Sequence, residues 1–178
     1  MLKSFLSKVK DNRRDEGKRY KLEHILLFSI LAILSEATSY RRIAKFIKAR
    51  YEVLNEMFDL NWKGRPSHTT VRNIIQGTSG TELERSFREY SQELAKNDKK
   101  KRVISGDGKV LRGSFDHFND QKGIQILSAF LSDNHLILAH EEIDAKTNEI
   151  PMIQKLMTEL GLSDYIFTLD ALHCQKKL

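Results

Sequence analysis

Val103-Ile104-Ser105-Gly106-Asp107 marks the point at which the sequence changes from helical to extended periodicity. The run is β-prone and closes on an aspartate, and residues 165–170 repeat the pattern with Asp170 at the end. Aspartates that close two strands of a buried sheet can present paired carboxylates to a divalent metal ion. A strand-terminal aspartate is more often a turn or cap residue, so this spacing alone leaves both interpretations open.

Residues 103–178 are predicted to fold as a mixed sheet in the order β-β-β-α-β. The strands are expected at 103–107, 124–132, 136–143 and 165–170, and the helix at 149–160. Asp133-Asn134 is a turn sequence, so the second and third strands should form an antiparallel hairpin. Asn148 and Gly161 are expected to begin and end the helix. This order, with an aspartate on the first strand and another closing the fourth, resembles the start of a ribonuclease-H-like domain, where those two strands are neighbours.

The first hundred residues are predicted to be helical throughout. The helices are expected at 22–35, 40–58, 68–76 and 81–94. The first of these is apolar nearly all round, which is typical of a buried central helix. The second has an apolar face opposite a basic one, and Ser39 and Ser67 are expected to cap the second and third helices.

The run Lys96-Asn97-Asp98-Lys99-Lys100-Lys101-Arg102 is too charged to bury and divides the chain. It separates an expected helical domain, residues 1–98, from an expected sheet domain, residues 103–178. The predicted fold class is therefore an all-helical N-terminal domain followed by part of a ribonuclease-H-like α/β core.

The net charge of +6 hides an asymmetry between the two halves. Residues 1–102 hold 23 Lys and Arg against 13 Asp and Glu, whereas residues 103–178 hold 7 against 11. This pattern is typical of a protein that meets a polyanion with one part and concentrates carboxylates in the other. The alternative is that the excess basic residues lie in two solvated tracts, 8–21 and 96–102.

Composition favours a soluble globular protein, because 40% of the 178 residues are hydrophobic and 30% are charged. Cys174 is the only cysteine, so an intrachain disulfide is excluded and a cytoplasmic location is expected. The most apolar stretch, residues 25–34, is shorter than the roughly 20 residues needed to cross a bilayer. No membrane partner is expected.

Three motifs, in the right order along the chain, resemble those of one family. Asp107-Gly108-Lys109-Val110-Leu111-Arg112-Gly113-Ser114 is similar to the DGK-x-LRGS signature of bacterial DDE transposases of the H-repeat-associated group. Residues 144–151 resemble that family's K-[ST]-NEI segment, and residues 168–176 resemble its DA…CQK segment. Residues 11–20 and 66–70 are similar to the helical domain that precedes the family's catalytic core.

The resemblance implies a transposase in which Asp107 and Asp170 are catalytic and hold Mg²⁺ or Mn²⁺. Water, and later a 3′-hydroxyl, would attack a DNA phosphodiester there. The family's third acid is a Glu on a helix beyond the second Asp, and the sequence has none at that place. The expectation is a C-terminally truncated core with weak or absent metal binding, no strand-transfer activity of its own, and an exposed apolar edge at 165–170.

Double-stranded DNA at the ends of the element is the expected partner, together with a second copy of the chain or a full-length transposase. The helix after Pro66, preceded by the basic helix, has helix-turn-helix character. The alternative is an ordinary helical packing module whose arginines are solvated. The expected DNA contacts are Arg41, Arg42, Lys45, Lys48, Thr69, Thr70, Arg72, Asn73, Lys109, Arg112, Gln175 and Lys176. A second function stays open at this point: a non-catalytic DNA-binding or interaction protein that modulates a full-length transposase.

Overall fold

The computed structural model describes residues 2–95, 102–111, 114, 123–132, 135–143, 149–161 and 165–170. The chain divides into two compact units, Met1–Ser86 (the helical unit) and Phe87–Leu178 (the sheet unit). The division falls inside one long helix, α6 (Gly80–Ala95), whose second half packs with the sheet unit. The expected functional domains, 1–98 and 103–178, stay a prediction.

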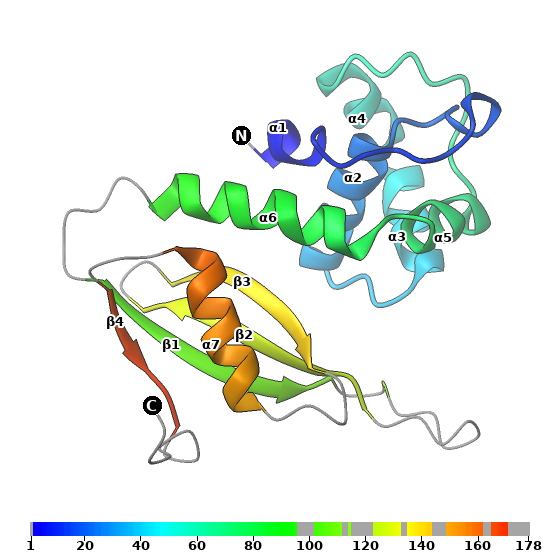
Figure 1. Ribbon diagram of the computed structural model, residues 1–178. Helices are drawn as coiled ribbons and strands as arrows, with labels where there is room; N and C mark the ends of the chain where they lie inside the picture. Colours follow the sequence, from blue (N-terminus) through cyan, green and yellow to red (C-terminus); the bar gives the residue numbers. More distant parts are fainter. Residues whose placement is uncertain are drawn as a thin grey trace. The chain divides into compact units, whose positions relative to one another are not determined.

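The helical unit is built from short helices in chain order (Figure 1). They are α1 (Leu2–Leu6), a 3₁₀ turn (Asp15–Gly17), α2 (Leu22–Leu34), α3 (Tyr40–Ala49), α4 (Tyr51–Met57), α5 (His68–Gln76) and the first half of α6. The predicted helices at 22–35, 68–76 and 81–94 are confirmed, as are the caps: Ser39 Oγ accepts from Arg42 N, and Ser67 Oγ accepts from Thr70 N. Within the described residues, no helix is long and apolar enough to cross a membrane.

The centre of the helical unit is α2, and α1, α3 and α5 pack against it. Ile25, Phe28 and Ala32 are completely buried, as expected for a helix that is apolar on every side. Ser29 is also buried, and its hydroxyl donates a 2.6 Å hydrogen bond to the carbonyl of Ile25. That bond satisfies the hydroxyl of Ser29 within the core.

The single helix predicted over 40–58 is wrong, because the chain breaks at Arg50 into α3 and α4. Arg50 has φ −113° and ψ 16°, outside the helical region. Beyond the break, the Tyr51 hydroxyl donates to the carbonyl of Trp62, and the Asn55 side chain accepts from Trp62 N at 3.2 Å. Trp62 is itself buried, so these two bonds fix α4 to a loop that lies farther along the chain.

The sheet unit contains four strands in the spatial order β3-β2-β1-β4 (Figure 1). Its elements are β1 (Arg102–Val110), β2 (Gln125–Leu131), β3 (Leu136–Ile143), α7 (Glu149–Leu160) and β4 (Tyr165–Thr168). β2 pairs antiparallel with both β1 and β3, whereas β1 and β4 are parallel. The predicted order, the hairpin, and the neighbouring first and fourth strands are confirmed. β4 lies at one edge of the described sheet, with Ile166 50% exposed.

The first strand is longer than predicted, because it continues past Asp107 to Val110. The ladder with β2 runs on through Lys109 opposite Ile126 and Val110 opposite Gln125. Two glycines interrupt the apolar pattern in this part of the strand, which is why sequence reasoning ended it at Asp107. The aspartate therefore lies within β1 rather than after it.

One face of the sheet is covered by α7, which crosses it in Figure 1. Ile153 and Leu156 of α7 are buried in one cluster with Ile104 and Leu127 of the strands. Gly106 lies where the helix approaches the sheet most closely: a Cβ there would be 2.4 Å from Ile153 Cδ1. We call this the helix-covered face. The opposite face, which carries Ser105, Asp107, Lys109 and Thr168, we call the carboxylate face.

Candidate metal site and candidate DNA interface

The register of β1 and β4 places the residues that precede Asp107 and Asp170 opposite each other. In the parallel ladder Ser105 lies opposite Thr168, and each aspartate follows two residues later in its own chain segment. Side chains two residues apart in extended chain point to the same face, and neighbouring strands lie about 4.8 Å apart. If the same register continued for two residues beyond Thr168, Asp170 would lie beside Asp107 on the carboxylate face.

A contact between two hydroxyl groups joins β1 and β4 two residues before the aspartates. Ser105 Oγ and Thr168 Oγ1 are 2.8 Å apart, and Ser105 Oγ also lies 3.3 Å from Ser132 Oγ. Sequence reasoning did not single out Ser105 or Thr168. The available signal was their position, since each lies two residues before one of the aspartates. β4 has only four residues, so this side-chain bond adds to a short backbone ladder.

Lys109 supplies the positive charge next to Asp107. Its Nζ is 3.0 Å from Asp107 Oδ2, and the two side chains are 79% and 56% exposed. A pair this exposed contributes only about 0–1 kcal/mol, so Lys109 can leave Asp107 at little cost. Three other expected DNA contacts, Arg112, Gln175 and Lys176, lie outside the described residues.

The donors present suit a hard divalent cation. Carboxylate oxygens are the ligands that Mg²⁺ and Mn²⁺ prefer, and both aspartates are exposed to an incoming ion. Within the described residues, no group of three or more His, Cys, Asp or Glu side chains is arranged to hold a metal ion. The described site therefore offers two protein ligands, which fits an ion that keeps several waters or phosphate oxygens in its shell.

The expected DNA contacts of the helical unit lie on α3 and α5, which pack against each other. Ile43, Ile47, Val71 and Ile74 are buried on their inner sides. The exposed members of the expected set are Arg41, Arg42, Lys45, Lys48, Thr69, Arg72 and Asn73. Thr70 differs, because its hydroxyl lies 2.9 Å from Ser67 Oγ and belongs to the helix cap.

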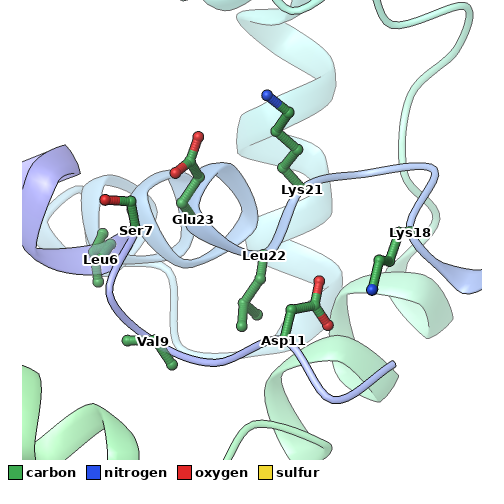
Figure 2. Close-up of a pocket in the computed structure, with 8 residues that line it drawn as sticks. All are labelled: Leu6, Ser7, Val9, Asp11, Lys18, Lys21, Leu22 and Glu23. Atoms are coloured by element: carbon green, nitrogen blue, oxygen red, sulfur yellow. The ribbon is translucent and has the colours of Figure 1, made fainter. Parts of the chain in front are cut away.

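A hollow of about 180 Å³ lies between the segment after α1 and the start of α2 (Figure 2). Its charged lining is mixed, with Lys18 and Lys21 accompanied by Asp11 and Glu23. Asp11 is already bound by Arg13, whose Nε and Nη2 lie 2.8 and 2.7 Å from its two oxygens. That guanidinium lowers the pKa of the Asp11 carboxyl, chiefly through these hydrogen bonds. This part of the basic tract at 8–21 is therefore built into the fold rather than simply solvated.

Comparison with known proteins identifies one family model and several relatives that match the sequence. The family model described as "DDE_Tnp_1-associated" matches residues 3–91. The chain is 30% identical to "Putative transposase YncI" of Escherichia coli (strain K12), an alignment that covers 99% of this chain and 71% of that protein. It is 30% identical to "H repeat-associated putative transposase YhhI" and 32% identical to "Putative protein YbfL" of the same strain, and spans 46% of each. No solved structure matches the chain.

Proposed function

This chain belongs to the DDE_Tnp_1-associated family and so has a transposase-family role; from that premise, we propose that it serves DNA transposition by metal-dependent cleavage and strand transfer. In this proposal the helical unit binds duplex DNA. The sheet unit contributes Asp107 and Asp170 as the first two metal-binding acids of a ribonuclease-H-like core. The observation that supports the proposal is the parallel register of β1 and β4, in which Ser105 and Thr168, each two residues before one of the acids, lie opposite each other.

The ribonuclease-H-like assignment is supported by topology. Three antiparallel strands are followed by a helix on one face and by a fourth strand that returns parallel to the first. The acids lie on the face opposite that helix, within β1 and just after β4. Both are therefore accessible to a DNA backbone, whereas the helix-covered face is filled by apolar packing.

The chemistry follows from the charges that these side chains hold. A divalent ion, when bound, stabilises the attacking and leaving oxygens of an in-line displacement at phosphorus. Asp107 and Asp170 would position that ion, and Lys109 would move from Asp107 to a DNA phosphate oxygen. The third acid of the family would have to come from beyond Asp170. A second copy of the chain, or a longer transposase, stays a proposed partner.

Neutralising either aspartate is expected to weaken binding of Mn²⁺ by at least about tenfold, since even changes behind the first ligands cost 10- to 100-fold. The variants are Asp107→Asn and Asp170→Asn, and binding is followed by the loss of the electron paramagnetic resonance signal of free Mn²⁺. Asp15→Asn, which removes a 93% exposed carboxylate from the helical unit, is the control. Equal Mn²⁺ affinity in all four proteins would remove the metal-site proposal. Metal-dependent cleavage of DNA, if the chain has it, should be lost in Asp107→Asn.

Removing two charges from α3 is expected to weaken binding to duplex DNA and to flatten its salt dependence. Each phosphate contact contributes about 0.9 to the slope of log affinity against log salt, so Arg41→Gln with Lys45→Gln should reduce the slope by about 2. Fluorescence anisotropy of a labelled duplex, titrated at several salt concentrations, measures both quantities. Lys10→Gln with Arg14→Gln, two exposed residues of the same unit, is the matched control. The DNA-binding proposal would be contradicted if the unaltered chain did not bind duplex DNA, or if its affinity did not change with salt concentration.

A further inference from the structure

A cationic hollow of about 190 Å³ lies at the corner between α3 and α4. Lys48 comes from the end of α3, Arg50 from the break between the helices, and Arg65 from the loop before α5. Glu52 is the one carboxylate among the residues that line it. Segments that are distant in sequence thus bring three cations to one concave site, which is the arrangement an anion requires.

Both arginines are held against aromatic rings. The Arg50 guanidinium lies 4.4 Å from the centre of the Phe46 ring, and that of Arg65 lies 5.2 Å from the Tyr51 ring. A stacked guanidinium is fixed in its plane, while its N–H groups stay available at the edge of that plane. This is the geometry with which arginine binds two oxygens of one phosphate.

The loop that carries Arg65 is anchored at two residues before it. Tyr51 donates to the carbonyl of Trp62, and the Tyr20 hydroxyl donates a 3.2 Å hydrogen bond to the carbonyl of Gly64. A Cβ at Gly64 would be 3.1 Å from Arg19 Nη2, so a further cation lies close to the same loop. The break at Arg50 and this anchored loop therefore hold the hollow in shape before a ligand arrives, which lowers the entropy cost of binding.

The charges of the hollow are not used elsewhere in the described part of the chain. Lys48, Arg50 and Arg65 form no ion pair there, although the hollow includes Glu52. The hollow in Figure 2 is different, because its lysines lie among carboxylates and Lys18 pairs with Asp15 at 2.9 Å. An excess of unpaired, preorganised cations is the electrostatic signature of a phosphate site.

We propose that this hollow binds a backbone phosphate of duplex DNA and so sets the position of α5 on the duplex. The inference rests on the proposed DNA binding and extends it to Arg50 and Arg65, which are outside the contacts considered above. Lys48 continues the exposed basic row of α3, and Arg65 lies two residues before Ser67, which caps α5. A phosphate held here fixes the register of the helix that follows, without reading bases itself.

The test compares the full chain with the variant Arg50→Gln/Arg65→Gln in the same duplex titration. The variant is expected to bind about tenfold more weakly at low salt, and its slope of log affinity against log salt should be smaller by about 1, because one phosphate contact is lost. Lys10→Gln/Arg14→Gln should stay close to the unaltered chain. A scan of duplexes that carry one neutral methylphosphonate each should find a position that weakens the unaltered chain but not Arg50→Gln/Arg65→Gln.

Further measurements distinguish failure of the proposed DNA binding from failure of the hollow as a phosphate site. If the unaltered chain does not bind duplex DNA, the proposed function fails. If Arg41→Gln/Lys45→Gln binds weakly but Arg50→Gln/Arg65→Gln binds as tightly as the unaltered chain, only the hollow is overturned. A titration with inorganic phosphate, followed by the arginine side-chain NMR signals, tests whether the hollow is a site for free anions. If phosphate saturates these signals but Arg50→Gln/Arg65→Gln has no effect on duplex binding, the inference is overturned. Arg50→Lys/Arg65→Lys keeps the positive charges and loses the planar edges of the guanidinium groups. It replaces the glutamine variant in the test if that variant is poorly folded, and its affinity for the duplex is expected to lie between tight binding by the unaltered chain and the tenfold loss.

Discussion

Gly106→Ala is expected to lower the free energy of unfolding of the sheet unit by about 1–3 kcal/mol, the usual cost of overpacking a core. The added Cβ would meet Ile153 Cδ1 at 2.4 Å and Leu169 Cδ2 at 2.7 Å. Both distances are shorter than real contacts, so the side chains of Ile153 and Leu169 must shift. Leu169 adjoins Asp170, and the same change is therefore expected to displace one of the two acids.

Urea unfolding followed by far-UV circular dichroism measures this loss. Gly80→Ala is the matched control, because a Cβ there meets nothing within 4 Å and alanine favours the helix. The fluorescence of Trp62, the only tryptophan, reports on the helical unit. A Gly106→Ala protein as stable as Gly80→Ala would mean that α7 does not approach the sheet as closely as described.

Arg88→Met is expected to destabilise the sheet unit by about 1–3 kcal/mol, because it leaves partly buried carboxylates with fewer partners. The Arg88 guanidinium binds Glu159 at 2.8 Å, Glu141 at 2.9 Å and the carbonyl of His140 at 2.9 Å. It is only 20% exposed and joins α6 to β3 and α7. Lys155 still contacts Glu141 at 2.7 Å, which keeps the expected loss below that of a fully buried pair.

The effect of this substitution should depend on pH. The hydrogen bond from Arg88 is the main reason that the pKa of Glu159 lies below its ordinary value of 4.5. A group whose pKa is lowered by folding stabilises the fold above its ordinary pKa, and that contribution disappears as pH falls through the folded-state pKa. The difference in unfolding free energy between the unaltered protein and Arg88→Met is thus expected to be larger at pH 7 than below pH 4.5.

Chemical denaturation at neutral and acidic pH measures the difference. Arg85→Met is the control, since Arg85 is 63% exposed and pairs only with nearby Glu82 among the contacts described. Equal losses from Arg85→Met and Arg88→Met at pH 7 would show that the contacts of Arg88 do not hold the sheet unit together.

Much of the fold could be predicted because it depends on local patterns. The apolar periodicity of residues 22–34 and the serine caps before α3 and α5 need no distant partner. The break at Arg50 could not be predicted in this way, because it depends on bonds between α4 and Trp62. The extension of β1 beyond Asp107 was missed for a related reason: glycines carry no apolar signal, and their role appears only when α7 is in place.

In the candidate site, too, the residues marked by local sequence could be predicted, and the contacts between distant segments could not. Asp107 and Asp170 could be proposed from sequence because each lies at or near the end of a β-prone run and in a recognisable motif. The hydroxyl pair of Ser105 and Thr168 joins residues 63 positions apart. Their places two residues before the aspartates are visible in the sequence, but the contact itself depends on the register of the two strands. The cationic hollow needs a helix break and an anchored loop together, and neither was visible beforehand.

The parallel pairing of β1 with β4 also bears on the order of folding. β2 and β3 are joined by 4 residues and β1 and β2 by 14, so these three strands can assemble early as an antiparallel meander. β4 can join β1 only after the chain has closed a loop of some 60 residues, which costs about 1 kcal/mol more in closure entropy than the connection between β1 and β2. We therefore expect the two aspartates to meet in the last step of folding. A chain that has not finished folding would then carry both acids without a place to bind the metal.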